Sequence, residues 1–178
     1  LSILMTIWAC GTEVPDTAPA PEPVTAEAPA QSPSTAGAPT DWVSSPPSSK
    51  MRQAQFPIAR AKGDPEDGEV SIFDFNGGGG TVEANFARWA GQMKVEGHPD
   101  PLAAAKITKT TRDKLTLHGI DLTGTFVAET RPGSGKRVNK PDWRLIGTII
   151  EGPGCPWFVK LTAPAATAAL YADASDKW

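Results

Sequence analysis

Residues 143–162 read WRLIGTIIEGPGCPWFVKLT, two apolar runs separated by a turn that is rich in glycine and proline. Runs of β-branched and aromatic residues on both sides of such a turn are typical of a β-hairpin, so we expect strands at 143–151 and 157–162. Strands that are joined by hairpins run in opposite directions. This stretch therefore predicts an antiparallel sheet.

The chain before this hairpin adds further strands to the sheet. Four earlier runs have strand composition, at 51–59, 69–75, 106–111 and 114–128. In the last of them, Leu115 and Leu117 share one phase of the alternation, whereas Ile120 and Leu122 share the other. A change of phase within one strand indicates a β-bulge, which we expect at Gly119.

Two segments have the spacing of an α-helix rather than of a strand. Within 81–94, apolar residues recur on one helical face, namely Val82, Phe86, Trp89, Ala90 and Met93. A second helix begins at Pro164 and has Leu170, Ala174 and Trp178 on one face. This pattern stops without a C-cap, so we expect its last turns to be missing. Two helices and six strands fit an α+β domain whose helices cover a mainly antiparallel sheet.

Charge and composition exclude several classes of protein. The chain has 178 residues, 17 Lys and Arg, and 20 Asp and Glu, which gives a net charge of -3. Residues 51–178 hold 16 basic and 15 acidic side chains, a net of +1. A nucleic-acid-binding protein needs a concentrated basic footprint, so we do not expect nucleic acid as a partner. Two cysteines exclude a disulfide scaffold.

The first ten residues predict a signal peptide. Residues 1–9 are mostly apolar, and no initiator Met precedes Leu1, so we expect the segment to be incomplete at its start. The stretch Ile7–Cys10 resembles a bacterial lipobox, and this resemblance implies that Cys10 is lipidated. Two acyl chains on one residue anchor a protein stably in a membrane. The alternative is an ordinary secretory or buried segment in which the cysteine is incidental.

Residues 11–41 predict a disordered tether. Nine prolines and seven alanines lie between Val14 and Pro47, and no aromatic residue occurs there before Trp42. Proline lacks the amide donor and fixes φ, so neither a helix nor a strand ladder propagates through such a segment. We expect the ordered domain to span 42–178.

The sequence offers few candidate catalytic residues. The glycines at 77–80 complete neither a P-loop nor a G-x-G-x-x-G motif, and the glycines at 133–135 do not complete a P-loop. We therefore expect no cofactor, and no metal site, because His98, His118 and Cys155 are too few to predict one. Cys155 is left without a partner if Cys10 is acylated. A weak candidate for contact with an anionic partner is a basic loop, formed by Arg131, Lys136, Arg137 and Lys140.

Several motifs occur along the predicted domain, namely Pro46–Arg52 after Trp42, Gly63–Asp64, Glu66–Asp67, Val82–Trp89, Asp121–Phe126, Pro141–Ile146 and Trp157–Pro164. Together they resemble an uncharacterised family of bacterial lipoproteins and, more distantly, PsbP-like domains. The resemblance implies an α/β/α sandwich around an antiparallel sheet. PsbP-like domains serve mostly as accessory or partner-binding modules, and a fold alone does not assign an activity.

These observations lead to one functional hypothesis and two alternatives. We expect a lipid-anchored protein of the bacterial cell envelope, facing the periplasm or held in the outer membrane, whose single domain binds an envelope protein or a small ligand and is not an enzyme. One alternative is an envelope hydrolase with a site around His118 and Asp121. The other is a structural spacer.

Overall fold

The computed structural model describes residues 42–130, 133–154 and 156–175. Cys10, the segment 11–41, Arg131, Cys155 and Trp178 lie outside the described residues. The elements follow the order β1 (Arg52–Ile58), β2 (Gly68–Asp74), α1 (Val82–Ala90), β3 (Met93–Lys94), the short 3-10 helix η2 (Pro101–Ala104), β4 (Lys106–Arg112), β5 (Leu115–Phe126), β6 (Lys140–Glu151), β7 (Trp157–Pro164) and α2 (Ala165–Ser175).

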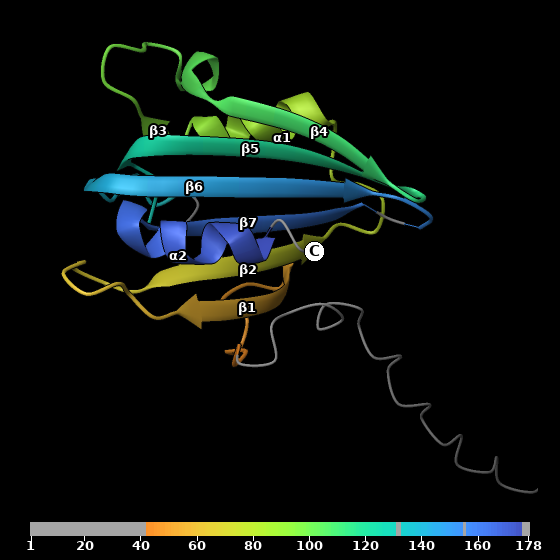
Figure 1. The fold of residues 1–178 in the computed structure, drawn as a ribbon, viewed down its shortest axis with the longest axis horizontal. Helices are drawn as coiled ribbons and strands as arrows, with labels where there is room; N and C mark the ends of the chain where they lie inside the picture. The colour runs from red at the N-terminus through yellow and green to blue at the C-terminus, as the bar shows by residue number, and fades with distance from the viewer. Residues whose placement is uncertain (1–41, 131–132, 155, 176–178) are drawn as a thin grey trace, which may run out of the picture. The chain divides into compact units, whose positions relative to one another are not determined.

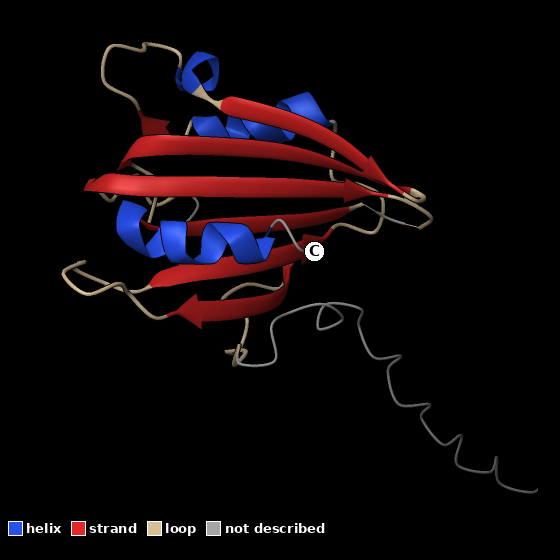
Figure 2. Ribbon diagram, in the orientation of Figure 1, coloured by secondary structure: helices blue, strands red, loops and turns tan. Residues whose placement is uncertain are grey.

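The strands form one antiparallel sheet in the order β1-β2-β7-β6-β5-β3, with β4 also paired to β5 (Figure 2). The mixed α+β class with a mainly antiparallel sheet is thus confirmed. The antiparallel pairing of β6 and β7 confirms the hairpin predicted within residues 143–162. Strand β7 is inserted between β2 and β6, so strands far apart in the sequence lie side by side.

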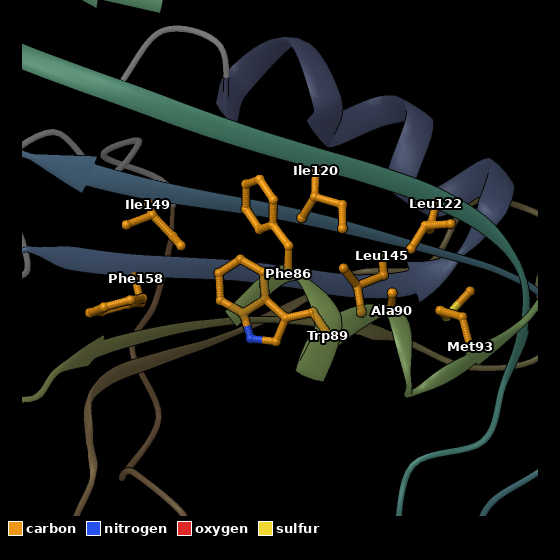
Figure 3. Packing of buried hydrophobic residues seen from close by; sticks show 9 residues of the cluster. All are labelled: Phe86, Trp89, Ala90, Met93, Ile120, Leu122, Leu145, Ile149 and Phe158. Atoms are coloured by element: carbon orange, nitrogen blue, oxygen red, sulfur yellow. The ribbon is translucent and has the colours of Figure 1, made fainter. Parts of the chain in front are cut away.

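The two helices pack against different faces of this sheet. On one face, Trp89 of α1 belongs to one buried cluster with Ile120, Leu145, Ile149 and Phe158 (Figure 3). Gly147 lies beneath that ring, and a Cβ there would overlap Trp89. On the other face, strand residues that alternate with this set gather around Ala168 of α2, namely Phe56, Val70, Ile72, Leu161 and Ala163. Because side chains alternate between the two faces along each strand, the strands contribute residues to two separate cores.

Helix α1 begins and ends differently from the prediction of 81–94. Thr81 is its N-cap and accepts a hydrogen bond from the Ala84 N–H at 3.2 Å. The helix ends at Ala90, and Met93 and Lys94 instead pair with Phe126 and Thr125 as strand β3. Residues 93–94 therefore form a strand with β5 although their spacing also fits a helix, and Met93 is buried in this strand.

The predicted buried face of the last helix is wrong. Leu170 is 66% exposed, whereas Thr167 and Ala168 are fully buried. The rotation of α2 is set by Thr167, whose backbone N–H and hydroxyl donate to Asp64 Oδ2 at 2.8 and 2.5 Å. The free energy gained from these two hydrogen bonds exceeds the free-energy cost of exposing Leu170. The side chain of Ala174 lies outside the described residues.

The β-bulge predicted at Gly119 is also wrong. The register between β5 and β6 is continuous from Thr116 to Gly124 and shifts only between Gly124 and Phe126. Position 119 favours glycine for a different reason, because a Cβ there would overlap the hydroxyl of Thr108 on β4. The change of phase arises because Leu115 and Leu117 lie on the face of β5 opposite Ile120 and Leu122.

Candidate functional site

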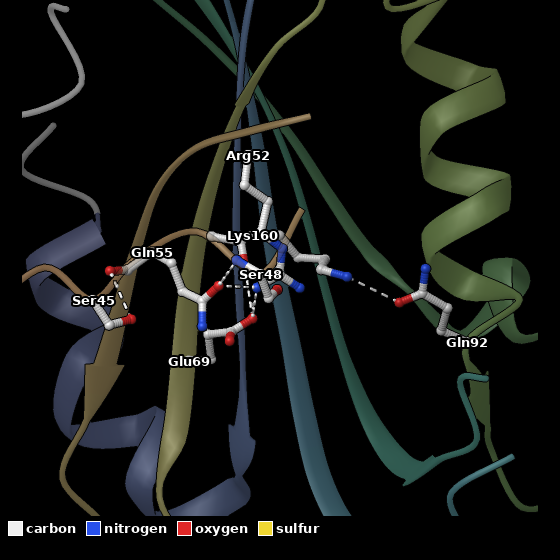
Figure 4. Close-up of polar contacts among 8 residues, drawn as sticks. Ser45, Ser48, Arg52, Gln55, Glu69, Gln92 and Lys160 are labelled. Atoms are coloured by element: carbon white, nitrogen blue, oxygen red, sulfur yellow. Dashed lines mark hydrogen bonds and ion pairs between the residues drawn. The ribbon is translucent and has the colours of Figure 1, made fainter. Parts of the chain in front are cut away.

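A group of polar side chains interrupts the apolar surface on the α1 side of the sheet. The register places Gln55 beside Ser71, Ser71 beside Lys160, and Lys160 beside Gly147. Arg52 and Glu69 lie on the same face of β1 and β2. We call these five polar residues the Lys160 cluster: Arg52, Gln55, Glu69, Ser71 and Lys160 (Figure 4).

The carboxylate of the cluster is already compensated. Arg52 donates from Nη1 to Glu69 Oε1 at 2.6 Å and to Gln55 Oε1 at 2.7 Å. The same Glu69 oxygen accepts a hydrogen bond from Ser71 Oγ at 2.7 Å. Ser71 is 1% exposed, and its hydroxyl is satisfied by this bond. Arg52 and Glu69 therefore form a supported ion pair that leaves Lys160 without a carboxylate of its own.

The amine of Lys160 has a neutral partner. Its Nζ donates to Gln92 Oε1 at 3.1 Å, and Gln92 follows α1 in the sequence. Figure 4 shows the lysine extending from β7 toward Gln92, with Glu69 and Gln55 on the other side. Among the described residues, Lys160 forms no ion pair.

The electrostatics of Lys160 follow from this environment. Part of the residue is exposed, but its amine is packed among protein atoms. Burial is the main reason why the pKa of Lys160 is lowered from 10.5 to about 8, and the positive charge of Arg52 is the next. Glu69 acts in the opposite direction, and Arg88 on α1 lowers the pKa further.

The charges around Lys160 do not balance. Arg52, Lys160 and Arg88 carry three positive charges and Glu69 carries one negative charge, which leaves a surplus of two. Arg88 donates from Nη2 to the amide oxygen of Asn85, which is neutral. A surplus of positive charge around a desolvated amine is complementary to an anion.

The structure does not bring His118 and Asp121 together. His118 pairs with Ile149, which belongs to the core under α1, whereas Asp121 pairs with Ile146, which packs with the core under α2. His118 Nε2 lies 2.8 Å from Glu151 Oε2. Asp121 instead binds the Arg144 guanidinium through both oxygens, at 2.8 and 2.6 Å. The two residues lie on opposite faces of the sheet and do not form a catalytic pair.

The basic loop is only partly available for an anionic partner. Lys140 Nζ lies 2.5 Å from Glu66 Oε2 and 4.4 Å from the centre of the Trp143 ring. Its charge is therefore largely compensated within the domain. Lys136 and Arg137 are exposed in the loop between β5 and β6, and Arg131 is outside the described residues.

Metal ligands and cavities add little to this description. Within 42–130, 133–154 and 156–175, no three His, Cys, Asp or Glu side chains converge as a metal site requires. An open depression near β3 and η2 is lined by Lys94, Val95, Gly97, His98, Pro99 and Pro101. In the part of the chain that the structure describes, no helix is long and apolar enough to span a bilayer.

Sequence reasoning missed the Lys160 cluster. Its one sequence signal is a lysine inside the apolar run FVKLT, where the neighbours on the same face, Phe158 and Thr162, are buried. The remaining members come from β1 and β2, which only the tertiary pairing with β7 brings alongside. No family model, no curated protein and no solved structure matches this chain.

Proposed function

We propose that this chain is a membrane-anchored lipoprotein of the bacterial cell envelope whose α+β domain is a binding module for an anionic ligand, with the Lys160 cluster as the binding site. The anchor is Cys10, and the proline-rich segment 11–41 is the tether that carries the domain. The apolar residues 1–9 and the Ile7–Cys10 pattern support the anchor. The localisation is the periplasmic side of the envelope or the outer membrane.

For the domain itself, the finer fold that we propose is a PsbP-like α/β/α sandwich. The packing of α1 and α2 against different faces of an antiparallel sheet supports this proposal. A PsbP-like domain is compatible with an accessory or binding role, but the fold does not specify the ligand. The ligand class is argued from the site alone.

The observation that carries the proposal is the amine of Lys160, which is desolvated and lies near a surplus of positive charge. Among the described residues it is hydrogen-bonded only to the neutral amide of Gln92. An anion placed beside this amine would form a charge-assisted hydrogen bond in a medium of low dielectric constant. Carboxylates and phosphates share this chemistry. Ser71 supplies a hydroxyl beside Glu69, but it is 1% exposed and already donates to that carboxylate, which favours binding over catalysis at the cluster.

The test uses the chain of residues 1–178 with Cys10→Ser, which prevents acylation. Binding of inorganic phosphate, of succinate and of vesicles that contain phosphatidylglycerol is measured by calorimetry and co-sedimentation. We expect saturable binding of a free anion or of the vesicles, weakened at least tenfold by Lys160→Met. The matched control is Lys62→Met, which removes an exposed lysine in the loop between β1 and β2.

The same experiment distinguishes the sources of the anion and the rival functions. Binding of phosphate or succinate identifies a soluble ligand, whereas binding of vesicles alone identifies a lipid headgroup. If Lys160→Met and Lys62→Met bind every probe as well as the parent does, the cluster is not the site. If the parent binds none of them, the binding role is wrong and the structural spacer gains support.

A further inference from the structure

Strand β4 is an open edge of the sheet. All seven of its residues are exposed, and in the described part of the chain it pairs only with β5 (Figure 1). An unpaired strand edge presents a row of backbone N–H and C=O groups that can bind a further strand. Four of the seven residues are β-branched, namely Ile107, Thr108, Thr110 and Thr111, a composition that favours an extended backbone.

The opposite end of the sheet is protected in a way that β4 is not. Alongside β1, the Ser45 N–H donates to the carbonyl of Gln55 at 2.8 Å. The Ser48 N–H donates to Gln55 Oε1 at 3.1 Å. A proline, Pro57, further interrupts the row of amide donors in β1. Among the described residues, the chain thus covers the β1 edge and leaves the β4 edge uncovered.

The charges of β4 all have the same sign. Lys106, Lys109 and Arg112 recur at every third position, and the strand contains no acidic residue. None of the three forms an ion pair with a carboxylate of the described residues. Lys106 lies opposite Asp121 in the strand register, and Asp121 is paired with Arg144. Lys109 is the smallest cause of the lowered pKa of Glu83 on α1, which is due chiefly to a hydrogen bond from its own backbone and then to one from the Thr81 side chain.

This charge pattern selects among the possible occupants of the edge. Lysines on an edge strand oppose pairing with a second copy of the same strand, because like charges would face each other. The same charges attract an extended segment that carries carboxylates. Alternation places Lys106 and Arg112 on one face and Lys109 on the other, so such a segment is held from both faces.

From these observations we propose that β4 binds an extended acidic segment of a partner protein, which adds to the sheet as an outer strand. Main-chain hydrogen bonds supply the affinity, and the three cations supply the selection for acidic sequences. In an antiparallel register the partner would place acidic residues opposite Arg112, Lys109 and Lys106, and an apolar residue opposite Ile107, which is 51% exposed. This surface is separate from the Lys160 cluster, which lies on β1, β2 and β7.

The test adds a capped peptide, Glu-Thr-Thr-Glu-Thr-Val-Glu, to the isotope-labelled chain with Cys10→Ser. Its acidic positions match the three cations in either strand direction. We expect saturable shifts of the β4 amide signals, slower hydrogen exchange of the β4 amides that face outward, and weaker binding as salt is raised. The control peptide replaces each Glu with Lys and should produce none of these changes.

Two variants with the same change of charge complete the test. The first reverses the charge of the β4 edge with Lys106→Glu, Lys109→Glu and Arg112→Glu, and should lower the affinity for the acidic peptide at least tenfold. The second reverses three exposed lysines elsewhere, with Lys50→Glu, Lys62→Glu and Lys136→Glu, and should leave most of the affinity in place. Equal loss in both variants, shifts confined to other strands, or no saturable binding of the acidic peptide would overturn the proposal.

Discussion

Lys160 on β7 is joined to Gln92, beyond the end of α1, by a hydrogen bond of 3.1 Å from the lysine ammonium to the amide oxygen. The bond links the sheet to the segment between α1 and β3 across 68 positions of the sequence. It satisfies one of the three N–H donors of the ammonium without neutralising its charge. The buried positive charge of Lys160 is therefore a cost to the folded state, and we expect that cost to be measurable.

The first prediction concerns stability as a function of pH. The pKa of Lys160 falls from 10.5 in the unfolded chain to about 8 in the folded protein. Between these values the unfolded chain binds more protons than the folded protein, so stability rises with pH through this window. Below pH 8 the full cost of about 3 kcal/mol applies. Lys160→Met should therefore stabilise the protein at pH 7, and its advantage should shrink as the pH approaches 10.

Urea unfolding of Lys160→Met and its parent at pH 7 and at pH 9.5 measures this difference. Lys62→Met serves as the control, because Lys62 is exposed and removal of its charge should change the stability little at either pH. If Lys160→Met changes the unfolding free energy by the same amount at both pH values, the amine is not desolvated as described.

A second prediction concerns the contact of Gly147 with Trp89. A Cβ at position 147 would overlap the indole ring and lie 2.9 Å from Cγ2 of Ile120, and the ring is held in the core under α1. Gly147→Ala should therefore destabilise the protein by about 1–3 kcal/mol, as overpacking does. Gly152→Ala is the matched control, because its Cβ would meet the exposed end of Leu115, which can move.

Thermal or denaturant unfolding of the two glycine variants compares these sites directly. We expect a larger loss of stability at position 147 than at position 152. Equal losses would mean that the cost belongs to removing any glycine from this part of the chain and not to the ring of Trp89.

The third prediction concerns the start of α2. Asp64 Oδ2 accepts from both the N–H and the hydroxyl of Thr167, and Thr167 Oγ1 in turn accepts from the Ala61 N–H at 2.9 Å. The carboxylate caps the first turn of the helix from a loop far away in the sequence. Asp64→Ala should cost about 1–2 kcal/mol. Glu96→Ala, at an exposed position, should change the stability by less than about 0.5 kcal/mol.

Hydrogen exchange locates the effect of Asp64→Ala as well as its size. We expect the amides of the first turn of α2 to lose protection, because Thr167 loses its acceptor. Loss of protection spread evenly over the sheet, with α2 unchanged, would show that Asp64 does not hold the helix.

A fourth prediction separates His118 from Asp121. Their side chains lie on opposite faces of β5 and have different partners, Glu151 and Arg144. In a double-mutant cycle of His118→Ala and Asp121→Asn, the two stability changes should add to within about 0.5 kcal/mol. Asp121→Asn and Arg144→Gln should instead be strongly coupled. A coupling of His118 to Asp121 as large as that of the ion pair would contradict this placement and revive the hydrolase hypothesis.

Local sequence patterns were sufficient to predict most of the strands and the antiparallel class of the sheet. The alternation within 143–151 and the turn after it predict the hairpin of β6 and β7 because both signals are local. Patterns that depend on long-range contacts were not predictable. Met93 fits a helical face as well as it fits β3, and only its pairing with Phe126 decides between them. The face of α2 depends on Asp64, which is 103 positions from Thr167.

The candidate site was hidden for the same reason. Lys160 meets Arg52 and Glu69 only because β2 pairs with β7, and the sequence does not specify that strand order. The two residues that the sequence did single out, His118 and Asp121, are three positions apart in a strand. An odd spacing in a strand places side chains on opposite faces, so their closeness in sequence was misleading.

The most direct test of the account is the pKa of the Lys160 amine, measured by side-chain NMR in the chain with Cys10→Ser and assigned with the Lys160→Met variant. We predict a titration midpoint of about 8 without ligand, and a higher midpoint with phosphate or succinate, because a bound anion stabilises the charged amine. A midpoint near the ordinary lysine value of 10.5 that no anion moves would show that Lys160 is neither desolvated nor part of an anion-binding site.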